Sequence, residues 1–168
     1  MKKLLTIAVL AMFLPLAAGA QEGLRKVYDE NSNQLEQIDK AVKQAKADGK
    51  FVICHVGGNW CPWCLRFADF ITKDAEIAKL VADNFVYIHV DYNPRVFKDN
   101  PARKELTEKA MKRLGNPGRF GYPVFVVLDS RGNVIHTQDS SFLEEGQSYD
   151  KKKVVRFFQN WTPKAVGK

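Results

Sequence analysis

Cysteine and histidine are scarce in this 168-residue chain, which has three of each. They are Cys54, Cys61 and Cys64, together with His55, His89 and His136. Three cysteines are too few, and odd in number, for a disulfide scaffold. A zinc site needs four ligands, yet the sequence has no second C-x-x-C and no H-x3–5-H spacing to complete one. Covalent haem attachment is disfavoured as well, because Leu65 follows Cys64 where a histidine would be needed.

The chain also lacks a long apolar run and a basic stripe. The apolar stretch at residues 4–16 is short for a membrane span of roughly 20 residues, and Pro15 interrupts its end. The net charge of +7 arises from short clusters such as Lys151-Lys152-Lys153, without interleaved aromatic residues. Lysines of this kind are typical of a solvated surface, so no nucleic-acid partner is expected.

The first twenty residues have the pattern of a secretory signal peptide. Met1-Lys2-Lys3 is basic, an apolar stretch follows, and Ala18-Gly19-Ala20 supplies small residues at the cleavage positions. We expect cleavage after Ala20, release from the membrane, and a periplasmic or secreted location. Residues 21–168 then form one domain with a core of ordinary size.

Apolar spacing predicts the elements of that domain in order. Residues 32–48 have helical spacing, 51–56 form a buried strand, and a helical pattern runs from residue 62 towards 81. The expected elements that follow are a strand at 85–90, a helix at 101–114, strands at 124–128 and 134–137, and a helix that begins at 150. The core face of this last helix carries Phe157, Phe158 and Trp161. Loops are expected at 115–121 and around 144–146. The order αβαβαββα predicts an α/β fold with a mixed central sheet and helices on both faces.

The C-x-x-C pair lies where the first strand passes into a helix. Residues three apart in a first helical turn share a face, so Cys61 and Cys64 can close a small disulfide. Cys61 lies where the helix dipole is positive and the first amides are unpaired, which favours the thiolate that attacks disulfides. Pro62 fits the first helical position, and Trp60 and Trp63 flank the pair with apolar surface. This assigns Cys61 as nucleophile and Cys64 as resolving thiol; half of a zinc site and a structural disulfide remain open alternatives.

With these motifs in place, the chain resembles the thioredoxin superfamily, and within it exported bacterial thioredoxin-like proteins. The resemblance rests on the strand at 51–56, on Trp60-Cys61-Pro62-Trp63-Cys64, and on Gly121-Tyr122-Pro123-Val124, and the element order matches across nearly the whole mature chain. It implies a thioredoxin-like fold and a thiol–disulfide oxidoreductase whose redox group is the Cys61–Cys64 disulfide, with no other cofactor and no metal. It also implies protein disulfides or dithiols as substrates. A membrane protein is a candidate electron donor, although the sequence names neither the donor nor the substrate.

The resemblance further implies roles for residues around the two cysteines. Pro123 holds the place of a cis proline beside the dithiol, and Tyr122 the place whose backbone contacts substrate; the alternative is a trans proline that merely starts a strand. Trp60, Pro62 and Trp63 complete the expected substrate surface. Where thioredoxin carries a buried carboxylate this chain has His55, which either transfers a proton to or from Cys64 or is a core residue.

The sequence leaves several interpretations open. Pro62-Trp63 differs from the middle pair of thioredoxin, so the direction of electron flow is undecided. A binding module with an incidental dithiol and a copper carrier are alternative functions, although no methionine-rich segment accompanies the cysteines. Cys54 and His89 are predicted to be structural, and Asp91 is interpreted as a turn residue.

Overall fold

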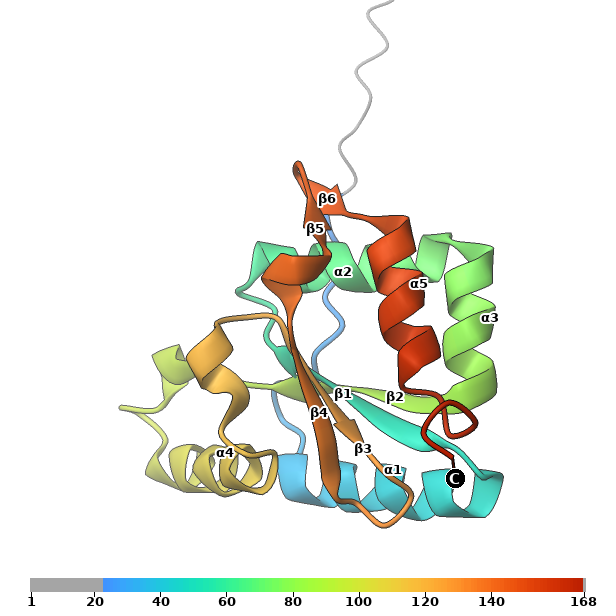
Figure 1. Cartoon of the computed structure of the whole chain (residues 1–168). Helices are drawn as coiled ribbons and strands as arrows, with labels where there is room; N and C mark the ends of the chain where they lie inside the picture. Colours follow the sequence, from blue (N-terminus) through green and yellow to red (C-terminus); the bar gives the residue numbers. More distant parts are fainter. Residues whose placement is uncertain (1–22, 168) are drawn as a thin grey trace, which may run out of the picture.

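A four-stranded mixed sheet occupies the centre of the computed structural model, which describes residues 23–167 (Figure 1). The strands are β1 (Phe51–Gly57), β2 (Phe85–Asp91), β3 (Val124–Leu128) and β4 (Val134–Asp139), in the spatial order β2-β1-β3-β4. β1 pairs in parallel with β2 and antiparallel with β3, and β3 pairs antiparallel with β4. The predicted mixed sheet is confirmed. The predicted signal peptide lies outside the described residues.

Helices cover both faces of this sheet, as predicted. They are α1 (Gln34–Asp48), α2 (Pro62–Lys73), α3 (Ala75–Asn84), α4 (Pro101–Arg113) and α5 (Lys151–Asn160). α1 and α4 pack on one face, and α2, α3 and α5 lie on the other (Figure 1). Within residues 23–167 no helix combines the length and the apolar character needed to cross a bilayer.

β1 is buried along its whole length because both of its faces are covered. Side chains alternate across a strand, so each face receives every second residue. Phe51 and Ile53 join the core under α2, α3 and α5, whereas Val52 and Cys54 join the core over α1 and α4. The continuous apolar run of this strand is therefore the pattern expected of a strand buried on both faces.

The predicted helical run from residue 62 towards 81 is wrong in one respect, because it is two helices. Asp74 has an extended backbone, with φ −93° and ψ 110°, and ends α2. Its side chain accepts the N–H groups of Glu76 and Ile77 at 3.0 and 3.1 Å, which caps α3. The cap lets α3 change direction while apolar residues of both helices still reach the same core.

Two predicted loops contain short ordered elements. The segment around 144–146 forms a small hairpin of β5 (Glu144–Glu145) and β6 (Ser148–Tyr149), with Gly146 at φ 58° in the turn. The 115–121 segment contains the 3-10 turn Pro117–Phe120. Further 3-10 turns lie at Pro94–Val96 and Ser140–Leu143. These elements are too short to leave a periodic signal in the sequence.

A buried ion pair fixes the carboxyl end of β2. Arg103 on α4 donates to Asp91 across 3.1 Å, and the two side chains are 10% and 2% exposed. The same guanidinium donates to the Ser32 carbonyl, and the side-chain amide of Gln34 donates to the Asp91 carbonyl at 3.0 Å. Asp91 is thus more than the predicted turn residue, because it joins β2 to α1 and α4.

Replacing Arg103 with methionine tests this anchor. The variant keeps most of the side-chain volume but leaves the Asp91 carboxylate buried without its partner, so we expect the free energy of unfolding at pH 7 to fall by about 3–5 kcal/mol. Burial raises the pKa of Asp91, against the lowering effect of Arg103, and the substitution would raise it further.

That raised pKa sets the sign of the pH dependence. A carboxyl group whose pKa is higher in the folded protein favours folding as the pH falls, because the folded state then binds the proton more readily. The deficit of Arg103→Met relative to wild type should therefore shrink between pH 7 and pH 4 in urea unfolding. An equal deficit at both pH values would contradict this account of Asp91.

Candidate active site

Cys61 and Cys64 form a disulfide where β1 passes into α2, the junction predicted from the C-x-x-C spacing. Their α-carbons lie 5.3 Å apart. Cys61 is the N-cap of α2, its Sγ accepts the N–H of Cys64 at 3.2 Å, and Pro62 occupies the first helical turn. The unpaired first-turn amides and the positive end of the helix dipole favour negative charge on the Cys61 sulfur.

The peptide bond between Tyr122 and Pro123 is cis, as the resemblance implied. Pro123 is buried and leads into β3, whose first residue Val124 pairs with Val56 near the end of β1. The Tyr122 carbonyl oxygen lies 3.7 Å from Cys61 Sγ, within reach of a thiol hydrogen bond when the disulfide is open. The fold thus brings residues 61 and 122 together.

Trp60 is held against the end of β2. Its Nε1–H donates to the Tyr92 carbonyl at 2.7 Å, and its ring meets Tyr122 edge to face at 5.8 Å. Tyr122 in turn stacks on Tyr92 at 4.9 Å. A β-carbon at Gly58 would lie 2.5 Å from Trp60 Nε1, so glycine is required there. The aromatic group on this side of the disulfide is therefore fixed by one hydrogen bond and close packing.

Trp63, three residues after Trp60 in the sequence, is held by Tyr149 of β6. The Tyr149 hydroxyl donates to the Trp63 carbonyl at 3.0 Å, and the two rings meet edge to face at 5.6 Å. Pro62 is exposed, while Trp60 and Trp63 are partly exposed. The structure places these predicted contact residues around the disulfide, and their contact with a substrate remains a prediction.

Asn59 fastens an N-terminal segment beneath the motif. Its Oδ1 accepts the N–H groups of Val27 and Tyr28, both at 3.1 Å, and its Nδ2 donates to the Tyr28 carbonyl at 2.9 Å. Tyr28 is only 5% exposed and packs with Cys61, Cys64 and Leu65. Tyr28 could not be identified from the sequence, because the residues around it have no periodic pattern.

Gly57, the last residue of β1, lies directly under the second sulfur. A β-carbon there would collide with Cys64 Sγ and would lie 2.9 Å from Tyr28 Oη. Gly57 is absent from the positive-φ residues of the described chain, so its backbone would accept another amino acid. Space, rather than backbone conformation, requires glycine at this position.

His55 lies on the same face of β1 as Gly57 and is completely buried. Neither ring nitrogen has a hydrogen-bond partner within residues 23–167. The ring is surrounded by those of Tyr28, Phe67, Tyr87, His89 and Phe125. Burial, reinforced by His89, holds the pKa of His55 well below its usual value, so the ring is neutral near pH 7. Its predicted role in proton transfer stays a prediction.

Cys54 belongs to the other face of β1, in the core over α1 and α4. Burial raises the pKa of this thiol to about 12, against a lowering effect from Arg113, so the thiol keeps its proton near neutral pH. Across residues 23–167 no three cysteine, histidine, aspartate or glutamate side chains gather as a metal-binding group.

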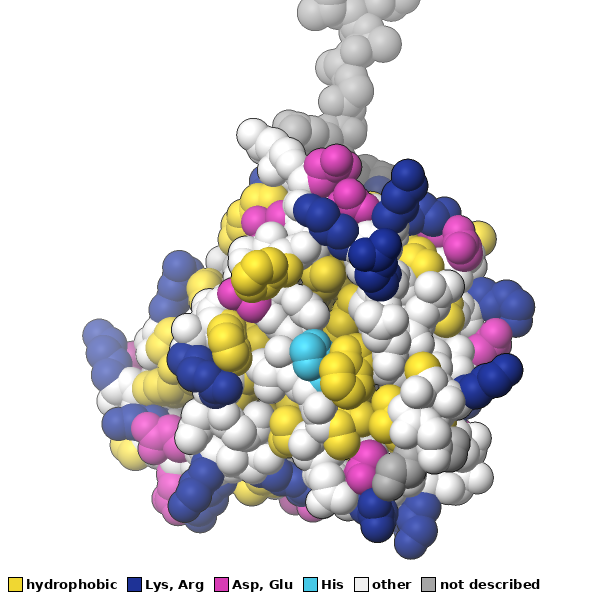
Figure 2. Space-filling view, in the orientation of Figure 1, with side chains coloured by type: hydrophobic (Ala, Val, Ile, Leu, Met, Phe, Trp, Pro, Cys, Tyr) yellow, Lys and Arg dark blue, Asp and Glu magenta, His cyan; other side chains and the backbone are white. Residues whose placement is uncertain are grey.

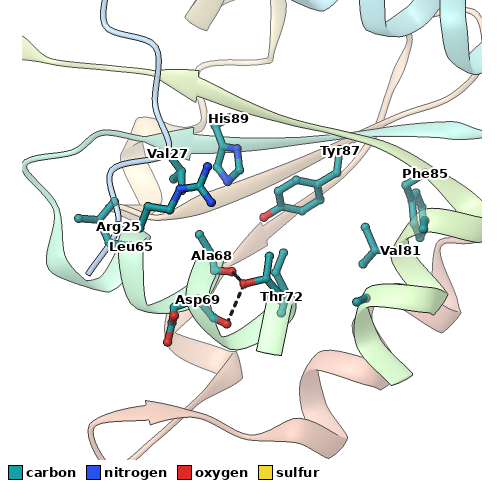
Figure 3. Close-up of a pocket in the computed structure, with 13 residues that line it drawn as sticks. Arg25, Val27, Leu65, Ala68, Asp69, Thr72, Val81, Phe85, Tyr87 and His89 are labelled. Carbon is teal, nitrogen blue, oxygen red and sulfur yellow. Dashed lines mark hydrogen bonds between the residues drawn. The ribbon is translucent and has the colours of Figure 1, made fainter. Parts of the chain in front are cut away.

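A hollow of about 430 Å³ opens between α2, α3 and β2 (Figure 3). Its walls are mostly apolar, and Tyr87 and His89 project into it from β2, near Arg25 and Val27 of the N-terminal segment. Burial lowers the pKa of His89 to about 4, so this ring too is neutral near pH 7. No residue of the Trp60–Cys64 motif lines the hollow.

Charges are mixed on the face of the molecule that carries β4 and α5. Figure 2 shows lysine and arginine side chains around the periphery with acidic side chains among them, and hydrophobic side chains gathered nearer the centre. Phe142, which follows β4, is 72% exposed.

The comparisons with known proteins give the family. The family described as "Thioredox_DsbH: Protein of unknown function, DUF255" matches residues 17–162, most of the chain. The chain belongs to this family.

Related proteins agree with the Thioredox_DsbH assignment. The chain is 28% identical over 124 residues to "Thiol:disulfide interchange protein DsbD" of Ralstonia nicotianae, covering 74% of this chain and 18% of that protein. It is 25% identical over 101 residues to "Disulfide bond reductase DsbH" of Chlamydia pneumoniae, covering 59% and 58%. The chain therefore spans less than a fifth of this DsbD relative and somewhat more than half of the DsbH relative.

Solved structures show the fold. A disulphide isomerase from Xylella fastidiosa Temecula1 superposes with a TM-score of 0.64 at 24% identity, covering 82% of this chain and 97% of that one. A structure described as DsbH oxidoreductase gives 0.51 at 18% identity, covering 92% and 93%. The Thioredox_DsbH chain thus has the thioredoxin fold that its sequence predicted.

Replacing Gly57 with alanine tests the close approach of Cys64 to β1. The new methyl group would collide with Cys64 Sγ, so we expect the oxidised protein to lose about 1–3 kcal/mol of stability. Because an unlinked Cys64 side chain can rotate away, the reduced protein should lose less. Thermal unfolding of both forms measures the difference, with Gly23→Ala as control, since nothing lies within 4 Å of a β-carbon at Gly23. Equal losses in the two forms would show that the clash is relieved elsewhere.

Proposed function

We propose that this protein is a thiol–disulfide oxidoreductase that exchanges disulfides with other proteins through Cys61 and Cys64. The observation that carries the proposal is the disulfide at the N-terminus of α2, with the Tyr122 carbonyl oxygen 3.7 Å from the Cys61 sulfur. Membership of the Thioredox_DsbH family and the names of the DsbD and DsbH relatives support the same activity.

In the reducing direction, the Cys61 thiolate attacks one sulfur of a substrate disulfide. A bond forms between Cys61 Sγ and that sulfur, and the other substrate sulfur leaves as a thiolate. Cys64, as a thiolate, then attacks Cys61 Sγ, which re-forms the internal disulfide and releases the second substrate thiolate. Two electrons pass from the dithiol to the substrate. The dithiol loses two protons in the net reaction, and the two product thiols take up two.

The rim around Cys61 is suited to hold an extended polypeptide. Pro62 is exposed, and Trp60, Trp63 and Tyr122 are partly exposed, so a substrate chain would meet apolar surface on both sides of the sulfur. The Tyr122 backbone would pair with the substrate backbone beside the bond that reacts. Such contacts recognise chain shape more than sequence, which suits protein disulfides as a substrate class.

Export and a membrane electron donor form the finer part of the proposal. The signal-like residues 1–20 support export to the periplasm or beyond, where thiols are not kept reduced by the cytosolic pools. A reductase working there needs two electrons for each cycle. We therefore assign a membrane protein carrying a dithiol as the electron donor to Cys61–Cys64.

The reduction potential decides the direction of exchange. A value near about −270 mV is that of a thioredoxin-like reductant, and one near about −120 mV that of a strong oxidant. The relative named as a disulfide bond reductase supports the reducing direction. Equilibration with glutathione buffers of known ratio measures this potential.

Single cysteine replacements test the mechanism. We expect Cys61→Ser to abolish reduction of insulin disulfides, because no nucleophile remains at the helix N-terminus. Cys64→Ala should trap a mixed disulfide with the substrate, visible as a mass increase of the intact protein that a reductant reverses.

Cys54→Ala is the matched control, since it removes the third thiol from the other face of the sheet. It should retain the activity of the wild type. Undiminished insulin reduction by Cys61→Ser would refute the proposed mechanism.

A further inference from the structure

The hydroxyl group of Tyr28 lies beside the resolving sulfur. Tyr28 Oη is 2.9 Å from the position of a β-carbon at Gly57, and Cys64 Sγ is closer still to the same point. Tyr28 Oη and Cys64 Sγ are therefore separated by less than twice 2.9 Å. Tyr28 and Cys64 also belong to one buried cluster, in which Cys64 is completely buried.

This hydroxyl has no hydrogen-bond partner among the described residues while Cys61 and Cys64 are joined. A buried donor without a partner is costly, typically by about 1–3 kcal/mol, and calls for an explanation. Tyr87 and His89 also have orphaned atoms, but both residues line the hollow behind β2 (Figure 3). Tyr28 does not line it, and it is the residue of this group that packs against Cys64.

Asn59 fixes the tyrosine in this position. Three hydrogen bonds join its side-chain amide to the backbone of Val27 and Tyr28, and Asn59 stands only two residues before Cys61. The rings of His55 and His89 meet the Tyr28 ring edge to face at 5.5 and 5.3 Å. The backbone and the ring are both held, so the hydroxyl stays close to the sulfur.

We infer that Tyr28 is a positioning residue for disulfide exchange, and that its hydroxyl donates a hydrogen bond to the Cys64 thiolate once the internal disulfide opens. The inference rests on the proposed function for its catalytic meaning. Its structural claim, a bond between Tyr28 Oη–H and Cys64 Sγ, can be tested without any substrate.

The bond would act at the resolving step. Cys64 gives up its proton, and the resulting thiolate attacks Cys61 Sγ in the mixed disulfide. The substrate sulfur leaves with the bonding electron pair and takes up one proton in the net reaction, which balances the proton lost by Cys64. A thiolate in apolar surroundings is unfavourable unless a donor stabilises it. Tyr28 supplies that donor and keeps its own proton throughout, so no additional reactant is needed.

Burial holds the pKa of Tyr28 well above its usual value, with further raising effects from Asp91 and Tyr149. The hydroxyl therefore remains a donor over the whole range in which thiols titrate. The neighbouring histidines are neutral near pH 7, so neither supplies a positive charge to stabilise the thiolate. The N-terminal segment also carries the titratable residues Arg25, Lys26, Asp29 and Glu30, and α2 carries Arg66, Asp69 and Lys73. Tyr87 and Asp91 lie on β2 and Tyr149 lies on β6.

Tyr28→Phe removes the hydroxyl and keeps the ring. In a Cys61→Ala background, the carbon-13 shift of the Cys64 β-carbon reports the titration of that thiol alone. We expect the added Tyr28→Phe change to raise the midpoint of the Cys64 titration by about one pH unit, which is a tenfold change in the acid dissociation constant. An effect of this size is at the lower end of those measured for hydrogen bonds to charged groups. Tyr87→Phe, which removes an orphaned hydroxyl from the wall of the hollow, should leave the midpoint unchanged. An unchanged midpoint in Tyr28→Phe would overturn the inference, whatever that variant does to stability.

A kinetic measurement connects the bond to turnover. After mixing reduced protein carrying both motif cysteines with oxidised glutathione, acid quenching and intact mass follow the mixed disulfide. Tyr28→Phe should form it at the wild-type rate and resolve it about tenfold more slowly. Resolution at the wild-type rate would overturn the role of Tyr28 in catalysis. Failure of the wild-type protein to form any mixed disulfide would instead refute the proposed function, and the thiol titration would still decide the hydrogen bond.

Discussion

The contact between Cys64 and the backbone at Gly57 is the constraint on which the site depends. Because residue 57 has no side chain, the first turn of α2 can seat its second sulfur directly on the end of β1. The same gap admits the hydroxyl of Tyr28 from the N-terminal segment. Three pieces of the chain that are separate in sequence thus meet at one point, and a side chain at this point would push them apart.

Because side chains alternate along β1, neighbouring residues of this strand lie in the two different cores. Cys54 and His55 are neighbours in the sequence, yet they face opposite cores. Cys54 lies among aliphatic side chains in the core over α1 and α4, where its thiol stays protonated. His55 lies on the face shared with Gly57, in contact with the aromatic rings beneath the motif. A shift of one residue in register would exchange these environments.

Much of the fold could be predicted because strong local signals coincide with the tertiary arrangement. The apolar run at 51–56 and the C-x-x-C after it placed the disulfide at the right junction, and the resemblance around Pro123 gave the cis bond. The break at Asp74 was missed because the apolar spacing continues through it, although an aspartate is a common helix cap. Hydrophobic periodicity reports which face is buried and does not report where a helix turns.

The parts of the site that could not be predicted are held by contacts between distant residues. Tyr28 and Asn59 are 31 positions apart, and the ion pair of Asp91 and Arg103 depends on how α4 packs at the end of β2. Neither pair has a spacing that a helix or strand would impose. Their partners are set by the assembled fold, so each residue looks ordinary in the sequence.

The surroundings of the two sulfurs differ, and this difference separates their roles more clearly than their spacing does. Cys61 has the positive end of a helix, the N–H of Cys64 and the rim residue Tyr122 beside it, which suits a sulfur that meets substrate as a thiolate. Cys64 is enclosed by β1 and the N-terminal segment and is completely buried. A charge formed there must be stabilised from inside the protein, because water cannot do so. The burial of the second sulfur is therefore what calls for a donor from inside the protein.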